Sequence, residues 1–260
     1  MPCAWPHGFH RWKVFAGRDG FVERSGQADE TTVLFDIEKR GARVSKNDLE
    51  STIQKAYAKI ARLYDVWAWL TETRAARIAL EFAQIEPGMR ILEVATGTGR
   101  LFGELLKRNP TGVTIGLDLS PHMLQQARKK WRPGFAGGLV LGSAFQLPFA
   151  DQQFDLLICN FMIDLLPESD FSRVLEEFRR VLRRPGRLVI SYMAPGTKKV
   201  HSFWRWVARN YPSLLTGCRP ISPEKYLEKT GFRIVVLRKI SQNTFPEEVL
   251  KAEIANHHSA

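Results

Sequence analysis

The sequence predicts an α/β protein with a mostly parallel, seven-stranded sheet, helices on both of its faces and an antiparallel hairpin at its carboxyl end. Short apolar runs alternate with amphipathic stretches of helical period, a pattern typical of βαβ units and a parallel sheet. A glycine-rich turn follows the first apolar run. The last two apolar runs have no helix-length spacer between them, which predicts that they pair antiparallel.

The predicted elements follow one another from residue 49 to the end of the chain. An amphipathic helix covers about 49–64, where apolar residues recur at spacings of three and four. Later helices are expected over about 73–83, 100–108, 121–131 and 169–183. Strands are expected over 90–95, 113–119, 139–142, 154–160 and 187–193, with a final hairpin over 231–240 and about 247–253. Residues 1–48 show no such period and are predicted to be a weakly structured extension, so the folded domain is assigned to 49–260.

Composition limits the function classes. The 260 residues are 44% hydrophobic and 25% charged, which indicates a globular protein. Three isolated cysteines argue against a disulfide framework or zinc site, and no metal is expected. No apolar run has the length of a membrane span or signal peptide, so we expect a cytoplasmic protein. The net charge is +11, and the segment 179–219 has ten basic residues and no acidic one, which favours an anionic surface and suggests peripheral membrane association.

The most specific signal is the segment ILEVATGTGR at 91–100, an apolar strand that contains Glu93 and leads into Gly97 and Gly99. Glycines at this position let the backbone turn sharply and let a ligand approach without a Cβ in the way. A second strand ends at Asp118, nineteen residues after Gly99, where a carboxylate can accept hydrogen bonds from a ribose. A dinucleotide fingerprint requires a third glycine where Phe102 stands, and no Gly-Lys-Ser/Thr of a P-loop follows.

Together with later segments, these residues resemble the class I S-adenosylmethionine-dependent methyltransferases, in particular the ubiquinone/menaquinone-biosynthesis C-methyltransferases and bacterial phospholipid N-methyltransferases. The resemblance extends over about 56–253. It rests on the segments YAKIARLYD (57–65), LEVATGTG (92–99), GLDLSPHML (116–124), GSAFQLPFADQQFDLLICNF (142–161), LRRPGRLVI (182–190) and TGFRIVVL (230–237). It implies a Rossmann-like methyltransferase fold and S-adenosyl-L-methionine as cofactor.

The resemblance also implies a set of cofactor-binding residues. Glu93 would lie beneath the methionine moiety, Asp118 would hold the ribose, and the segment that contains Tyr64 would cover the cofactor. The remaining predicted contacts are Ala95, Thr96, Gly97, Gly99, Leu119, Met123, Ser143, Ala144, Asn160 and Phe161. Two positions depart from the family pattern. Ser143 stands where an Asp often accepts from the adenine, and Arg187 replaces the second glycine of a Pro-Gly-Gly turn.

Methyl transfer from a sulfonium mainly requires in-line alignment, so a catalytic base is optional. If the acceptor must lose a proton, the candidates are Asp164 and His201, with Tyr64 and Tyr192 as hydrogen-bond partners. The alternative interpretation makes Asp164 a helix N-terminus or surface turn residue and His201 a solvated lid residue.

The insertion at about 194–230 is predicted to be a substrate lid, because its aromatic residues alternate with cations in KKVHSFWRWVARNY. This favours a small, lipophilic or membrane-derived acceptor, such as a quinone precursor or a phospholipid headgroup. Two alternatives stay open: a methyltransferase associated with RNA, since the basic segments could follow phosphates, and a non-catalytic cofactor-binding partner protein. No RNA-binding module is found, so nucleic acid is not the expected partner.

Overall fold

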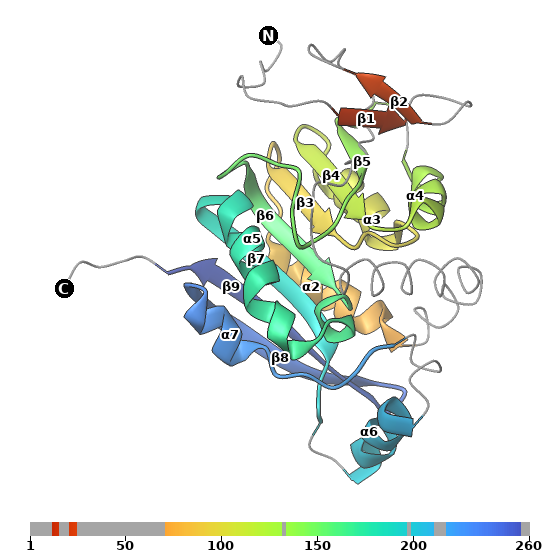
Figure 1. Ribbon diagram of the computed structural model, residues 1–260, viewed down its shortest axis with the longest axis vertical. Coiled ribbons are helices and arrows are strands. Elements are labelled where there is room, and N and C mark those ends of the chain that lie inside the picture. Colours follow the sequence, from red (N-terminus) through yellow and green to blue (C-terminus); the bar gives the residue numbers. More distant parts are fainter. Residues whose placement is uncertain are drawn as a thin grey trace, which may run out of the picture.

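In the computed structural model, a single twisted sheet of seven strands forms the centre of the protein (Figure 1). The structure describes residues 12–15, 21–24, 71–131, 134–196, 199–210 and 217–255. The strands of the central sheet lie in the order β5-β4-β3-β6-β7-β9-β8. All neighbours from β5 to β7 are parallel, and β9 pairs antiparallel with both β7 and β8.

The strand bounds agree with the predicted order of elements. They are β3 (Arg90–Val94), β4 (Val113–Asp118), β5 (Gly137–Leu141), β6 (Phe154–Asn160), β7 (Leu182–Met193), β8 (Phe232–Gln242) and β9 (Phe245–Ile254). The predicted α/β class, the parallel sheet and the antiparallel carboxyl-terminal hairpin are therefore confirmed. Two short strands, β1 (Trp12–Phe15) and β2 (Phe21–Arg24), pair antiparallel within the segment predicted to be a weakly structured extension. The domain boundary at residue 49 stays a prediction.

Helices cover both faces of the sheet (Figure 1). Apolar side chains of α2 (Thr73–Ala83), α3 (Arg100–Arg108), α4 (Pro121–Arg128) and α6 (Lys199–Asn210) pack on one face. Those of α5 (Phe171–Val181) and α7 (Glu224–Lys229) pack on the other, after the short 3₁₀ turns η2 (Ile163–Leu165) and η3 (Glu168–Asp170). Central strands are therefore buried on both sides, as parallel strands with helical crossovers require.

Local chemistry accounts for the helix ends that the sequence predicted. Ser120 is the N-cap of α4, its hydroxyl accepts a hydrogen bond from the amide of Met123, and Pro121 occupies the first turn. The α4 helix ends at Arg128 rather than at the predicted residue 131. The predicted helix over 49–64 lies outside the described residues.

Candidate active site

The carboxyl ends of β3, β4 and β6 meet at one edge of the sheet, because these neighbouring strands are parallel. The backbone turns sharply after β3, with positive φ at Ala95 (60°), Gly97 (56°) and Gly99 (78°). A non-glycine residue in this left-handed region is strained, and Phe161, directly after β6, is a second one with φ 48°. Two of the six non-glycine residues with positive φ in the described part of the chain therefore lie where adjacent strands end.

Glycine is suited to the two positions after β3 for different physical reasons. A Cβ on Gly99 would lie 2.6 Å from the Cα of Ala127, so glycine is required for α3 and α4 to pack together. A Cβ on Gly97 would meet no atom within 4 Å. The backbone of Gly97 therefore borders open space among the described residues, as expected of a loop against which a ligand lies.

Glu93 and Asp118 lie buried on either side of this turn. The hydroxyl of Thr96 donates to Glu93 Oε2 (2.7 Å), while Asp118 accepts from the amides of Gly97 (2.7 Å) and Ser120 (2.8 Å). Burial raises the pKa of Glu93 to about 8 and that of Asp118 to about 6, and the negative charge of Asp118 adds to the shift of Glu93. A cationic ligand beside these carboxyls would favour their ionised forms.

The other predicted cofactor contacts gather at the same edge. Met123 is buried in the first turn of α4, and Leu119 precedes that helix. Ser143 and Ala144 follow β5, and the Ser143 hydroxyl accepts from the amide of Phe145 (3.3 Å). At the end of β6, Asn160 Oδ1 is buried with no hydrogen-bond partner in the described part of the chain, which leaves an acceptor for a ligand. Tyr64 lies outside the described residues.

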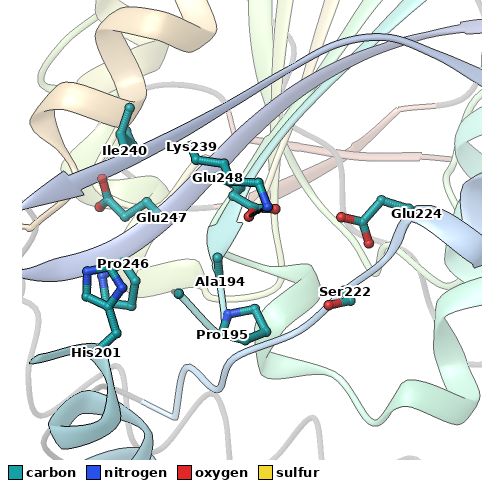
Figure 2. Close-up of a pocket in the computed structure, with 11 residues that line it drawn as sticks. Ala194, Pro195, His201, Ser222, Glu224, Lys239, Ile240, Pro246, Glu247 and Glu248 are labelled. Carbon is teal, nitrogen blue, oxygen red and sulfur yellow. Dashed lines mark ion pairs between the residues drawn. The ribbon is translucent and has the colours of Figure 1, made fainter. Parts of the chain in front are cut away.

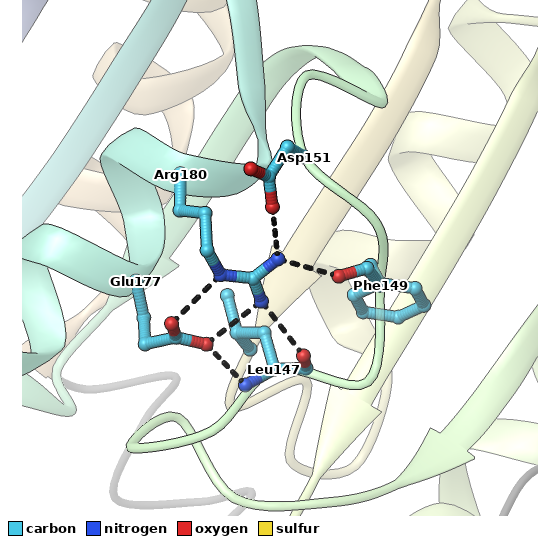
Figure 3. Close-up of polar contacts among 5 residues, drawn as sticks. All are labelled: Leu147, Phe149, Asp151, Glu177 and Arg180. Atoms are coloured by element: carbon cyan, nitrogen blue, oxygen red, sulfur yellow. Dashed lines mark hydrogen bonds and ion pairs between the residues drawn. The ribbon is translucent and has the colours of Figure 1, made fainter. Parts of the chain in front are cut away.

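Sequence reasoning missed Arg180, which holds the loop after β5 in place (Figure 3). Its guanidinium donates to the carbonyls of Leu147 (2.9 Å) and Phe149 (2.7 Å) and pairs with Asp151 (2.8 Å). It also forms a bidentate pair with Glu177, which in turn accepts from the amide of Leu147 (2.7 Å). The loop that contains Ser143 and Ala144 is thereby tied to α5 by side chains far away in sequence.

The two predicted catalytic bases lie near the carboxyl end of β7, the strand that neighbours β6. Asp164 in η2 is completely buried, accepts from the amide of Met193 (2.9 Å), and has a second oxygen with no hydrogen-bond partner among the described residues. Burial raises its pKa to about 7, within the range useful to a general base at neutral pH. His201 in α6 is 5% exposed and lines a cavity. Burial contradicts the alternatives that make Asp164 a surface turn residue and His201 a solvated lid residue, whereas Asp164 does lie in the first turn of η2.

Glu247 and Glu248 at the start of β9 were also missed. Both are buried, and they flank the carboxyl end of β7, since Met193 is paired in register with Glu247 and Tyr192 with Glu248. The Tyr192 hydroxyl donates to Glu248 (2.8 Å), so this tyrosine is bound to a carboxylate rather than to the predicted bases. The available signal was two adjacent glutamates in a predicted strand, because consecutive strand residues point to opposite faces and helices were expected on both faces of the sheet.

The model of the family described as "Methyltransferase domain" matches residues 91–186. A demethylmenaquinone methyltransferase of Thermotoga maritima is 36% identical over 165 residues, which is 59% of this chain and 69% of the relative. This chain belongs to the class I S-adenosylmethionine-dependent methyltransferases. The ubiquinone/menaquinone biosynthesis C-methyltransferase UbiE of Bordetella avium is 30% identical, with 64% of this methyltransferase and 67% of UbiE covered.

Other relatives share the methyltransferase's fold or only part of its sequence. The malonyl-[acyl-carrier protein] O-methyltransferase of Methylococcus capsulatus is 37% identical over 56% of this chain but only 52% of its own length. Among solved structures, a Haloferax volcanii methyltransferase in complex with the activator Trm112 superposes with a TM-score of 0.65 at 19% identity, covering 80% of this chain and 100% of that chain. A Burkholderia thailandensis N-methyltransferase with bound S-adenosylhomocysteine superposes with a TM-score of 0.62 at 14% identity, covering 84% and 94%.

The cofactor of the methyltransferase is S-adenosylmethionine, and the residues present fit it. Among the described residues, Gly97 borders open space and Asn160 Oδ1 has no hydrogen-bond partner. Two buried carboxyls are suited to a cation and to ribose hydroxyls. Over the described ranges, no three His, Cys, Asp or Glu side chains are grouped as a metal site. None of the helices in these ranges is both long enough and apolar enough to cross a membrane.

Proposed function

We propose that the methyltransferase transfers its methyl group to a small, lipophilic or membrane-derived acceptor, such as a quinone precursor or a phospholipid headgroup. The observation that most supports this is the exposed face of α6. Phe203 is 55% and Trp206 53% exposed, and their rings stack with centroids 6.3 Å apart. Large aromatic side chains are seldom left in water unless they contact another surface.

Cations accompany these aromatic residues on α6. Arg205 and Arg209 are exposed on the same helix, and the described part of α6 has no acidic residue. The other side of the helix is anchored, since Val207 is buried and the Trp204 indole donates to Thr244 (3.0 Å). Aromatic and basic groups on one exposed face suit the interface of an anionic membrane, where rings enter the acyl boundary and arginines meet phosphates.

The proposed cofactor contacts divide by chemistry. The bound cofactor supplies an electrophilic methyl group on a sulfonium. Asp118 is proposed to accept from the ribose hydroxyls, since a carboxylate that accepts two backbone amides still has lone pairs. Glu93 is proposed to face the cationic methionine end. The remaining proposed contacts are Tyr64, Ala95, Thr96, Gly97, Gly99, Leu119, Met123, Ser143, Ala144, Asn160 and Phe161.

Asp164 is the proposed general base for an acceptor that must lose a proton. The carboxyl accepts from the amide of Met193 at Oδ2 and from the Cys218 thiol, and Oδ1, which has no hydrogen-bond partner among the described residues, is proposed to receive the proton from the acceptor. His201 is proposed as a second proton-accepting group on the α6 side of the cavity that it lines. Asp164 and His201 therefore come from different elements, η2 and α6.

The test is to incubate the purified full chain with a methyl-labelled cofactor and separate acceptor classes. A demethylated quinone, phosphatidylethanolamine vesicles, malonyl-acyl carrier protein and bulk RNA form the four arms. We expect label only in the organic phase of the quinone or vesicle arm. Label confined to carrier protein or RNA would overturn the proposal.

The membrane part of the proposal has its own control. The double variant Phe203→Ser/Trp206→Ser should lose most co-sedimentation with anionic vesicles. Each Å² of apolar side chain that no longer enters the membrane removes about 25 cal/mol of binding free energy. The variant Val235→Ser is the match, since Val235 is 42% exposed on β8, away from α6. Equal loss in both variants would show that general surface hydrophobicity, not α6, attracts the protein to vesicles.

A further inference from the structure

A cavity of about 190 Å³ opens beyond the carboxyl end of β7, and Figure 2 shows the residues that line it. Because β3, β6 and β7 are parallel, the turn after β3 lies at the same end of the sheet. Because β9 runs antiparallel to β7, its first residues lie at this edge beside Met193 and Ala194. The α6 helix contributes His201, and the segment entering α7 contributes Ser222 and Glu224. The cavity is therefore lined by residues directly after β7 and by residues of β8, β9, α6 and the start of α7.

Glu247 is the unusual group in its wall. It is 1% exposed, and neither carboxyl oxygen has a hydrogen-bond partner in the described part of the protein. Burying an unpaired carboxyl costs several kcal/mol unless a partner or a proton compensates. Burial raises the pKa of Glu247 to about 9, so without a ligand the group holds a proton at neutral pH.

The cavity lining is acidic although the chain as a whole has a net charge of +11. Three carboxyls, Glu224, Glu247 and Glu248, line it against one lysine and one histidine. Glu248 already has two partners, Lys239 (3.3 Å) and the Tyr192 hydroxyl (2.8 Å), and Lys239 is 67% exposed at the rim. Glu247 is the carboxyl of the three whose partner no described residue supplies.

We propose that this cavity is the subsite for a positively charged nitrogen on the methyl acceptor, with Glu247 as its counter-ion. The inference rests on the proposed function and narrows it, since an ammonium headgroup fits the lining and a carboxylate acceptor is repelled by it. A cationic nitrogen supplies the positive charge with which neither oxygen of Glu247 is paired among the described residues. The volume limits the subsite to a small group.

Binding of a cation must displace the proton of Glu247. Several other charged groups act on this carboxyl from the elements packed around it, and none of them replaces the missing partner. Glu72 and Asp164 raise its pKa, and Arg74 lowers it. His201, Glu224, Lys239 and Glu248 are the further charged or titratable groups in the cavity. Cation affinity should therefore increase as the pH rises from 7 toward 9, with one proton released per cation bound at pH 7.

The test is isothermal titration of the full chain, saturated with S-adenosylhomocysteine, with choline and with its uncharged isostere in which carbon replaces nitrogen. Choline does not titrate, so any pH dependence belongs to the protein. We expect choline to bind at least about tenfold more tightly than the isostere, with proton release measured from the buffer dependence of the enthalpy. In Glu247→Gln, the preference and the proton release should both disappear. Glu253→Gln, the same change at a partly exposed residue of β9 that pairs with Arg233, should behave as the parent protein.

Each outcome is informative. Equal binding of the two probes, or an unchanged preference in Glu247→Gln, overturns the subsite while S-adenosylhomocysteine binding leaves the methyltransferase function standing. If the parent protein does not bind S-adenosylhomocysteine, this result would instead overturn the cofactor site. If Glu247→Gln does not fold, the pH series of the parent protein decides, and an affinity for choline that is flat between pH 7 and 9 contradicts the proposal.

Discussion

The two halves of the active-site edge are built by different physical means. On the cofactor side, one continuous turn after β3 presents Glu93, Gly97 and Gly99, and Asp118 ends the adjacent strand. On the acceptor side, Asp164, His201 and Glu247 come from η2, α6 and β9, three elements spread over more than eighty residues. The proposed cofactor contacts of the β3 turn therefore lie within one short stretch of sequence. The proposed acceptor-side groups are distant in sequence and are brought together only by the folded chain.

The largest expected effect concerns the contribution of the turn after β3 to the stability of the fold. Gly99→Val should destabilise the fold by about 3 kcal/mol or more, because its Cβ would lie 2.6 Å from the Ala127 backbone at a φ of 78°. The free energy of unfolding from urea denaturation measures this change. A loss below 1 kcal/mol would show that α3 and α4 can separate without cost.

Gly97→Ala separates binding from stability in the same turn. A Cβ at this position meets no other atom, so the substitution should lower the free energy of unfolding by only about 1 kcal/mol. This cost arises because alanine is disfavoured in the left-handed backbone conformation of Gly97. The Cβ would, however, occupy the space that the cofactor backbone contact requires, and affinity for S-adenosylhomocysteine should fall about a hundredfold. Gly88→Ala is the matched control, since Gly88 has φ 91° and open space but lies before β3. Unchanged affinity in Gly97→Ala would remove this turn from the cofactor site.

The buried carboxyls predict a stability that depends on pH. Burial raises the pKa of Glu93 to about 8 and that of Asp164 to about 7, so the folded state keeps protons that the unfolded state has released. The cofactor-free protein should therefore lose stability as the pH rises from about 5 to 8. Glu93→Gln should be about 2 kcal/mol more stable than the parent at pH 8 and bind the cofactor more weakly. Thermal unfolding at several pH values measures both the loss of stability of the parent protein with rising pH and the higher stability of Glu93→Gln at pH 8. A parent protein that gains stability as the pH rises contradicts the prediction.

Arg180→Ala tests the support of the cofactor loop from outside the motif. Loss of two carbonyl partners and of the Glu177 pair should cost about 2 kcal/mol and weaken cofactor binding, because the loop after β5 is released. Arg108→Ala removes an exposed pair with Glu104 on α3 and should cost under 1 kcal/mol. Identical losses in the two variants would mean that the loop is held by its own backbone.

The smallest expected effect concerns Ala95. Its φ of 60° is strained for alanine, so Ala95→Gly should raise the free energy of unfolding by about 0.5 kcal/mol while retaining cofactor affinity. Glycine also gains entropy in the unfolded state, which limits the benefit. A destabilisation above 1 kcal/mol would indicate that the alanine methyl group packs in the turn.

The sequence by itself determined the order of strands and helices, the cofactor turn and the ribose-binding candidate Asp118. These depend on local chemistry: apolar periodicity, an N-cap at Ser120 and glycines at defined spacings. Strand ends were less certain where glycine replaces apolar residues. β5 begins at Gly137, not at the predicted residue 139, because Gly137 lies against the Thr114 backbone.

Only the tertiary structure decided which charged groups are buried and which are partnered. Arg180 looks like any other cation of a basic segment until the loop after β5 folds against it. Glu247 looks like a surface glutamate until β9 pairs with β7 and α6 covers it. Burial and partnership depend on contacts between residues distant in sequence, and local periodicity contains no information about them.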